Sequence, residues 1–425
     1  MTRTEGPKPT LPPVYEAFLP REHALYRPRH GRKQLAALLC ATVFFATPAL
    51  SAILGARPSE FENRKLTPFP SIGQGWSFFT QLSQWTTDHL VFREQAVHAA
   101  DGISRGVFGE PPPLHQENQQ GPLQVPADTA PTKLDPRQFP DVIEGKDGWL
   151  YLGDEATSHC VQAVDLNTTF ARLRSFRDAV EASGRQFVVV VAPDKIGMVP
   201  QHLPDDYLGK DCRQKVADDF WHRVDAEPFM LDVRSGMQEW ANRKGAPLYG
   251  PQDAHWNDEG AITAVRAVAE KLRPGISRKW RLEPKAGWQL PADLPPLIGK
   301  TGLTEGTHYA LMPDGKTDRT RTMPSDYVTP VHTDTTSGDG TYGLRTAWIG
   351  DSFTIRALPY LAASFGDLTA LHTSTADHDS GEAIAELLQR SDVVVIEMTE
   401  RGFASGSVSL LSPAVQKNIS RKLNP

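Results

Sequence analysis

An uninterrupted apolar run, Phe187-Val188-Val189-Val190-Val191-Ala192, constrains the fold of this 425-residue chain more than any other feature. Such a run is typical of a strand that is covered on both faces, as in a parallel sheet between helices. A helix is predicted just before it, from about residue 168 to 183, and Gly184 is placed to end that helix. The run therefore predicts an α/β domain.

The same alternation of strands and helices continues along the chain. Further strands are predicted at 149–152, 229–233, 247–249, 347–349, 368–371 and 393–396. Helices centred near Val265, Tyr360 and Ile384 alternate with them. This order predicts a mostly parallel sheet between two helical layers, which is a three-layer α/β sandwich.

One segment interrupts the alternation. Residues 274–343 are rich in Pro, Gly, Thr and Asp and show little periodicity. The segment is too long for a plain connection inside a compact domain. We expect either a small β-rich insertion or a set of loops that frame a functional site.

The N-terminal part contains an apolar segment, 34–56, without one charged side chain. It is long enough to cross a bilayer as a helix. Basic residues precede it, namely Arg21, Arg27, Arg29, Arg32 and Lys33. They favour a cytoplasmic tail over residues 1–33, a single-pass anchor in the inner (cytoplasmic) membrane and an extracytoplasmic main domain. The alternative is a cleaved signal peptide with a weak small-residue site at Ala49-Leu50-Ser51.

The remaining boundaries follow from changes in composition. Residues 57–109 are expected to form a helical membrane-proximal segment, 110–140 a Pro-rich linker or loop, and 141–425 the α/β domain. Of the three cysteines, Cys40 lies in the apolar segment. Cys160 and Cys212 would form a disulfide in an oxidising compartment or stay as two buried thiols. The net charge of −6 argues against nucleic-acid binding.

Two short motifs carry the chemistry. Gly350-Asp351-Ser352 follows an apolar run and leads into a predicted helix, so Ser352 would lie at the carboxyl end of a strand and at a helix N-terminus. Asp253-Ala254-His255-Trp256 supplies a base and a carboxylate about a hundred residues upstream. A serine nucleophile needs a base to take its proton, and that base needs a third group to orient it.

The spacing supports a Ser352-His255-Asp253 catalytic set. Asp253 and His255 are two residues apart, so they project to the same side of an extended segment. If 247–249 is a parallel strand, both motifs lie at the same edge of the sheet. The alternatives are that Asp253 merely caps the following helix and that Gly-Asp-Ser is only a turn.

Three other residues are candidates for contact with substrate: Arg356, Lys195 and Trp256. Arg356 lies one turn after Ser352, Lys195 follows a strand end, and Trp256 neighbours His255. An exposed arginine, a solvated lysine and a packed tryptophan are the alternative interpretations. No His/Cys cluster has metal-ligand spacing and no Gly-rich phosphate loop occurs, so we expect no metal and no cofactor.

Gly350-Asp351-Ser352 resembles the nucleophile block of the SGNH hydrolases, whose Asp and His usually come later in the chain. Here Asp-x-His comes first, an order similar to that of the alginate O-acetyltransferase family of AlgJ and AlgX. Other segments that resemble this family, collinear over residues 59–403, are Glu62-Asn63-Arg64, Phe92-Arg93, Gly145-Lys146-Asp147-Gly148-Trp149-Leu150, Ala192-Pro193-Asp194-Lys195 and Val395-Ile396-Glu397-Met398-Thr399-Glu400-Arg401.

The resemblance implies an SGNH hydrolase-like fold and an O-acetyltransferase of extracytoplasmic polysaccharide. Ser352 would be the nucleophile, His255 the general base and acid, and Asp253 its orienting partner. A membrane-bound O-acyltransferase would be the partner that supplies acetyl groups. The alternatives are a carbohydrate acetyl-esterase with the same residues and a non-catalytic polysaccharide-binding subunit of an export complex.

Overall fold

The computed structural model describes residues 32–54, 69, 82, 85, 89, 134–335 and 338–424. The chain separates into two compact units, Met1–Ala96 and Val97–Pro425. In the first unit, most of the apolar segment 34–56 forms helix α1 (Arg32–Ile53). Among the described residues, no helix combines the length and the apolar character needed to span a membrane.

Much of the predicted N-terminal organisation lies outside the described residues. This holds for nearly all of the tail 1–33 and of the segment 57–109, including Glu62-Asn63-Arg64 and Phe92-Arg93. The predicted linker 110–140 is described only from residue 134, where the short 3-10 helix η4 (Pro136–Gln138) forms.

A six-stranded sheet forms the centre of the second unit, in the order β4-β3-β10-β8-β9-β7. Neighbouring strands from β4 to β9 are parallel, and β7 pairs antiparallel with β9 at the edge. The mostly parallel sheet predicted from the sequence is therefore confirmed. The strands are β4 (Met230–Asp232), β3 (Gln186–Ala192), β10 (Val393–Thr399), β8 (Tyr342–Gly350), β9 (Phe365–His372) and β7 (Val331–Asp334).

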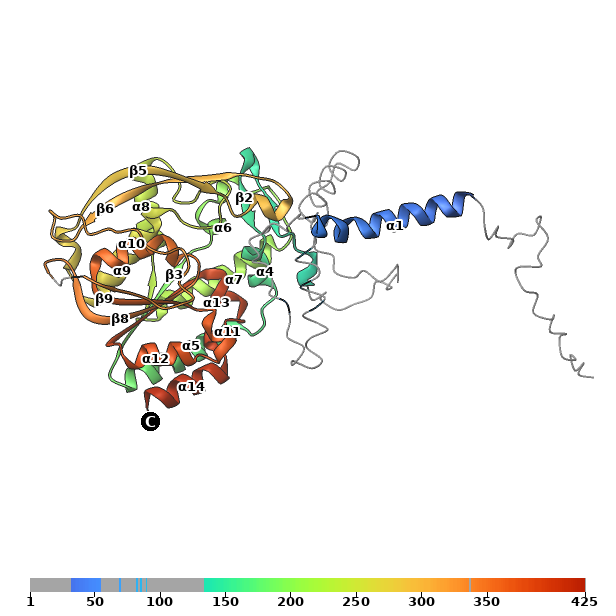
Figure 1. Ribbon diagram of the computed structural model, residues 1–425. Helices are drawn as coiled ribbons and strands as arrows, with labels where there is room; N and C mark the ends of the chain where they lie inside the picture. The colour runs from blue at the N-terminus through green and yellow to red at the C-terminus, as the bar shows by residue number, and fades with distance from the viewer. Residues whose placement is uncertain are drawn as a thin grey trace, which may run out of the picture. The chain divides into compact units, whose positions relative to one another are not determined.

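Helices cover both faces of this sheet (Figure 1). Helices α9 (Asp258–Leu272) and α10 (Thr354–Ser364) pack on one face. The opposite face is covered by α5 (Leu166–Ala182), α7 (Lys210–Ala226), α12 (Glu382–Gln389) and α14 (Pro413–Leu423). The other α-helices in the described part of this unit are α4 (Asp154–Cys160), α6 (Lys195–Met198), α8 (Arg234–Lys244), α11 (Thr375–Asp379) and α13 (Glu400–Ser405).

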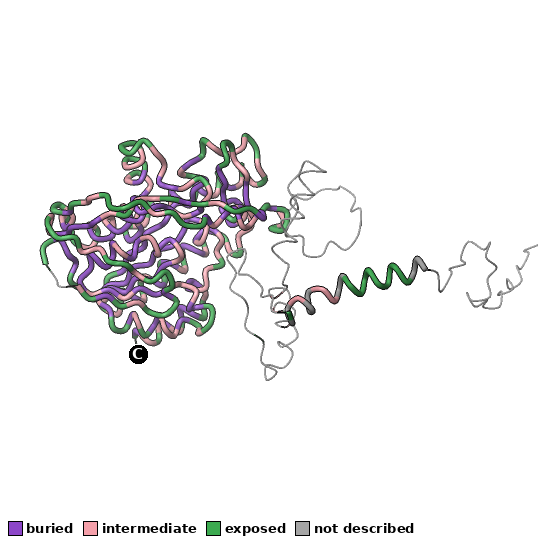
Figure 2. Tube along the Cα trace, turned by 45° about the horizontal axis from the view of Figure 1, so that its top comes forward, coloured by how far each residue is buried: buried purple, intermediate pink, exposed green. Residues whose placement is uncertain are grey.

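Strand β3 shows why the apolar run is continuous. Val188 and Val190 belong to the core on the α9 side, whereas Val189 and Val191 belong to the core on the α5 side. Successive side chains of a strand point to opposite faces, so a strand between two helical layers needs apolar residues at every position. Buried residues accordingly fill the interior of this unit (Figure 2).

Two predicted strands take other roles. Residues 149–152 contribute β2 (Leu150–Leu152), which pairs antiparallel with β1 (Val142–Glu144) in a separate two-stranded sheet. The prediction that 247–249 is a parallel strand of the main sheet is wrong. Tyr249 instead makes one isolated antiparallel bridge with Trp256, because the chain turns back on itself at residues 250–255.

The insertion 274–343 is the β-rich alternative. Strands β5 (Arg281–Pro291) and β6 (Leu303–Met312) form a long antiparallel hairpin, and β7 joins the main sheet. Most residues of β5 are exposed. A two-stranded ribbon with so little burial needs no alternating apolar pattern, which explains why its strands were not recognisable in the sequence.

A disulfide joins Cys160, the last residue of α4, to Cys212 in the first turns of α7. The two Cα atoms are 5.6 Å apart, which is a usual separation for a disulfide. Of the two alternatives left open by the sequence, the structure has the bonded pair, while Cys40 is a free thiol.

We predict that Cys160→Ser and Cys212→Ser each lower the free energy of unfolding by about 2–4 kcal/mol, because the disulfide closes a long loop. Denaturant unfolding of the full chain, followed by far-UV circular dichroism, measures this change. Cys40→Ser is the matched control and should leave the second unit's midpoint unchanged. Equal midpoints for all three variants and the wild type would contradict the pairing.

Candidate active site

The turn between β8 and α10 presents Ser352 at the carboxyl edge of the sheet. Gly350 is required there, because a Cβ atom would lie 2.0 Å from Thr354 Oγ1. The Asp351 carboxylate fixes the turn: Oδ1 accepts the Phe353 N–H at 3.0 Å, and Oδ2 accepts the Thr399 N–H at 2.9 Å. Asp351 thus ties the serine turn to the end of β10.

The two motifs meet at this edge. His255 Nε2 lies 2.9 Å from Ser352 Oγ, and His255 Nδ1 lies 2.9 Å from Asp253 Oδ1. The Trp256 indole N–H donates to the Phe353 carbonyl at 3.0 Å, so the histidine loop is attached directly to the serine turn. The structure therefore brings Ser352, His255 and Asp253 together, although 247–249 is not a strand of the sheet.

A second carboxylate, which the sequence analysis missed, also reaches the histidine. Asp293 Oδ2 lies 3.1 Å from His255 Nδ1, and Asp293 Oδ1 accepts the Ala254 N–H at 3.0 Å. Asp293 lies just after β5, between two prolines of a segment without a recognisable pattern. No pattern in the sequence indicates that Asp293 belongs to the site, because only the folding of the hairpin over the 250–255 loop brings it there.

The charges at this site favour a protonated histidine. Burial lowers the pKa of His255, but its hydrogen bonds to Asp253 and Asp293 and their negative charges outweigh burial and raise that pKa to about 9. Burial raises the pKa of Asp253, and the hydrogen bond and charge of His255 more than reverse this and hold it below the usual range. The His255 side chain keeps 26% of its surface exposed, so a substrate can reach it.

The arrangement is suited to transfer of a proton from a hydroxyl nucleophile. His255 Nε2 can take the Ser352 proton while the carboxylates stabilise the resulting imidazolium. Within the described part of the chain, the Ser352 backbone N–H has no hydrogen-bond acceptor. It lies just before the N-terminus of α10, so it is available to a developing oxyanion.

Lys195 and Trp256, both predicted to contact substrate, lie behind the site instead. Each is about 0–1% exposed. The Lys195 ammonium donates to the carbonyl oxygens of Leu150 (2.7 Å), Gly250 (2.7 Å), Pro251 (2.9 Å) and Asp253 (3.0 Å). With its protons directed at these carbonyls, Lys195 holds the histidine loop and is not available to a substrate. The ring of Trp256 packs edge-on against Phe353.

Arg356, the third residue predicted to contact substrate, is half-buried on α10. Its guanidinium carbon lies 3.7 Å from the centre of the Trp288 ring, which belongs to β5. The Trp288 indole N–H in turn donates to Asp258 Oδ2 at 2.7 Å. Arg356 therefore connects the helix that follows Ser352 to the hairpin.

A buried ionic network supports the ends of β3 and β10. Arg401 Nη1 donates to Asp194 Oδ1 at 2.9 Å, and Glu400 accepts from Arg213 at 3.0 Å and from the Asp194 N–H at 3.1 Å. The Arg401 guanidinium also lies over the Phe353 ring, 5.2 Å from its centre. These pairs hold the ends of β3 and β10 together, and the serine turn after β8 is attached to the end of β10 through Asp351.

Among the residues that the structure describes, two groups of side chains have a composition that could suit a metal: His159, Asp194 and Glu400, and Asp253, His255 and Asp293. In the first group, Arg213 and Arg401 already neutralise the carboxylates. In the second group, the separations of 2.9 and 3.1 Å are ordinary lengths for a shared N–H donor. Both groups are therefore explained by protons and ion pairs.

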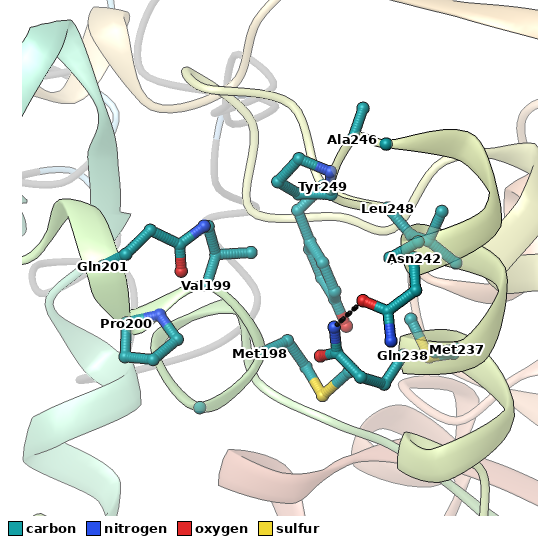
Figure 3. A pocket seen from close by; sticks show the side chains of 14 residues that line it. Met198, Val199, Pro200, Gln201, Met237, Gln238, Asn242, Ala246, Leu248 and Tyr249 are labelled. Atoms are coloured by element: carbon teal, nitrogen blue, oxygen red, sulfur yellow. Dashed lines mark hydrogen bonds between the residues drawn. The ribbon is translucent and has the colours of Figure 1, made fainter.

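A separate cleft of about 550 Å³ lies between the 197–201 segment and α8. Figure 3 shows the Tyr249 ring between Val199 on one wall and Gln238 and Asn242 on the other. The two amides are hydrogen-bonded to each other at 3.0 Å. Ser352 and His255 do not line this cleft, so it is not the place of the serine chemistry.

We predict that Lys195→Met lowers the free energy of unfolding by about 2–5 kcal/mol, because buried carbonyls lose their donor. Lys300→Met is the matched control: Lys300 is exposed and pairs with Glu144 at 3.1 Å, so its loss should cost less than about 1 kcal/mol. Denaturant unfolding measures both changes. Equal effects of the two substitutions would show that the Lys195 ammonium does not hold the loop.

The family described as "SGNH hydrolase-like domain, acetyltransferase AlgX" matches residues 142–392. The probable alginate O-acetylase AlgJ of Pseudomonas fluorescens is 26% identical over 133 residues, which are 31% of this chain and 34% of that protein. The protein of the same name from Pseudomonas syringae pv. tomato is 28% identical over 149 residues, 34% of this chain and 35% of that protein. The chain thus matches about a third of the length of these curated relatives.

The chain also resembles several solved structures. The O-acetyltransferase domain of Pseudomonas putida AlgJ aligns with 16% identity and a TM-score of 0.43, covering 66% of this chain and 98% of that one. Bacillus cereus PatB1 with a sulfonyl adduct aligns with 13% identity and a TM-score of 0.44, covering 64% and 98%. Because the family match spans more than half of its 425 residues, the chain belongs to the SGNH hydrolase-like family of the acetyltransferase AlgX.

Proposed function

We propose that this protein is an O-acetyltransferase that moves an acetyl group, through an acetyl-serine intermediate, onto hydroxyl groups of an extracytoplasmic polysaccharide. The observation that carries the proposal is the continuous hydrogen-bonded line from Ser352 Oγ through His255 to Asp253. Membership of the acetyltransferase AlgX family and relatives named alginate O-acetylase favour acetyl transfer over other serine chemistry.

In the first half-reaction, neutral His255 takes the Ser352 proton on Nε2 while Oγ attacks the carbonyl carbon of an acetyl ester. The Ser352 N–H donates to the oxyanion of the tetrahedral intermediate. Collapse breaks the ester bond of the donor, and the leaving oxygen takes the proton from His255. The products are the deacetylated donor and acetyl-Ser352.

In the second half-reaction, a sugar hydroxyl of the acceptor replaces the departed donor. His255 takes the hydroxyl proton as the sugar oxygen attacks the acetyl carbonyl, and the second tetrahedral intermediate collapses with release of Ser352 Oγ. The proton returns from His255 to Ser352. Asp253 remains ionised throughout and stabilises the imidazolium in both steps.

The donor and acceptor classes follow from the proposed location. The apolar segment 34–56 with its preceding basic residues is proposed as an inner-membrane anchor, with the catalytic domain extracytoplasmic. The Cys160–Cys212 disulfide supports an oxidising compartment. Acetyl groups would then come from a membrane-bound O-acyltransferase partner, and the acceptor would be a polysaccharide on the same side, with alginate as the first to test.

We predict that Ser352→Ala abolishes acetylation of the glycan, lowering it by at least about 10³-fold, because the hydroxyl that takes the acetyl group from the donor is lost. The full chain is incubated with an acetyl-ester donor and candidate polysaccharides, and glycan-bound acetate and free acetate are both measured. Ser374→Ala, which removes a hydroxyl bonded to His372 Nδ1 at 2.7 Å, is the matched control and should retain activity.

Two outcomes would contradict the proposal, one in this experiment and one in cells. Release of free acetate without any acetylated glycan, even at saturating acceptor, would identify the protein as an esterase. Full acetylation by Ser352→Ala, in cells that carry the complete acetylation system, would leave the protein only a non-catalytic role.

A further inference from the structure

Asp293 has a place at the site that a Ser-His-Asp set does not require. A triad needs one carboxylate on the distal nitrogen of its histidine, and Asp253 fills that role. Here His255 Nδ1 carries a single proton and faces two carboxylates, at 2.9 Å from Asp253 and 3.1 Å from Asp293. The two lie within hydrogen-bond distance of one N–H, so they share its donation.

The contacts of Asp293 show that its position is fixed. Its second oxygen accepts the Ala254 N–H at 3.0 Å. The carboxylate therefore contacts both the His255 ring and the backbone of the loop that carries it. The next residue, Leu294, is buried in the same small apolar cluster as Ala254 and donates its N–H to the Gln252 carbonyl at 3.3 Å. The hairpin insertion is therefore attached to the catalytic loop both at Asp293 and at the residue that follows it.

We propose that Asp293 is a positioning residue of this site: it shares the Nδ1 proton of His255 with Asp253 and so sets the pH range in which Ser352 is activated. The activity part of this inference rests on the proposed function, whereas the titration of His255 does not. It also gives the insertion 274–343 a direct connection to the chemistry.

The charged groups that face this pair come from several elements. Arg356 on α10 and Lys195 on α6 are the cations whose charges act on the carboxylates, the first on Asp253 and the second on both. The carboxylates themselves come from the loop before α9 and from the hairpin. Because both anions contact the ring directly and the Lys195 ammonium is directed at backbone carbonyls, the anions dominate at Nδ1.

The direction in which the carboxylates shift the pKa of His255 follows from the two protonation states of its ring. Each carboxylate stabilises the imidazolium more than the neutral ring, so the pair holds the pKa of His255 at about 9. At pH 7 only about 1% of the histidine would be the neutral base that Ser352 needs. Activity of the wild type should therefore rise from pH 7 towards pH 9 and level off above it.

We predict that Asp293→Asn lowers the His255 pKa by at least about one unit, because one negative charge is removed while the acceptor for the Ala254 N–H stays. The pKa is measured on the full chain with a chelator present, by NMR of histidines labelled at ring Cε1, and the His255 signal is assigned by its loss in His255→Gln. The rate of acetyl-Ser352 formation is measured over the same pH range.

Three further variants serve as checks on the Asp293→Asn measurement. Asp293→Glu keeps the charge and should keep the pKa within about half a unit, and Asp293→Ser is a second neutral variant if the asparagine fails to fold. Asp147→Asn is the control, because Asp147 contacts another histidine, His202, at 3.3 Å. It should leave the His255 titration unchanged.

The expected outcome is a downward shift of both the titration and the rising limb of the rate profile, with a high-pH rate within tenfold of the wild type. An unchanged His255 titration in Asp293→Asn and Asp293→Ser would overturn the proposal. So would a shifted titration with an unshifted rate profile. A shifted titration in a protein that forms no acetyl-serine would support the Asp293–His255 coupling and refute the proposed function alone.

Discussion

The site depends on one buried ammonium, that of Lys195. It holds the loop that carries Asp253 and His255 in place. Lys195 begins α6 shortly after the end of β3, so its backbone position is set by a buried strand of the main sheet. Its Nζ atom reaches four carbonyl oxygens, three of them in the loop, from Gly250, Pro251 and Asp253. A charged donor that satisfies buried carbonyls replaces the strand pairing that the loop lacks.

Two other contacts place this loop beside the serine turn and fix that turn to the sheet. The Trp256 indole attaches the loop to the Phe353 carbonyl, and Asp351 attaches the same turn to the end of β10. The hairpin closes the loop from the other side through Asp293 and Leu294. The geometry of the site therefore depends on three segments that are far apart in the sequence, and hydrogen bonds hold each of them in place.

The sequence predicted the parts of this structure that have periodic or local signals. The α/β sandwich followed from apolar runs such as Phe187–Ala192, and the Ser352 turn followed from a strand-Gly-Asp-Ser-helix pattern. The strand at 247–249 was predicted wrongly, because a short apolar stretch does not distinguish a strand from a loop that packs into a core. The role of Asp293 and the buried position of Lys195 could not be predicted from the sequence. Both arise only from tertiary contacts, which leave no periodic pattern or motif.

The proposed function requires that Ser352 accept an acetyl group with the help of His255. Mass spectrometry of the full chain after exposure to an activated acetyl ester tests it most directly. We predict one acetyl adduct on the peptide containing Ser352, which disappears in His255→Ala and is discharged when an acceptor glycan is added. An unmodified Ser352, or an adduct of equal yield in His255→Ala, would contradict it.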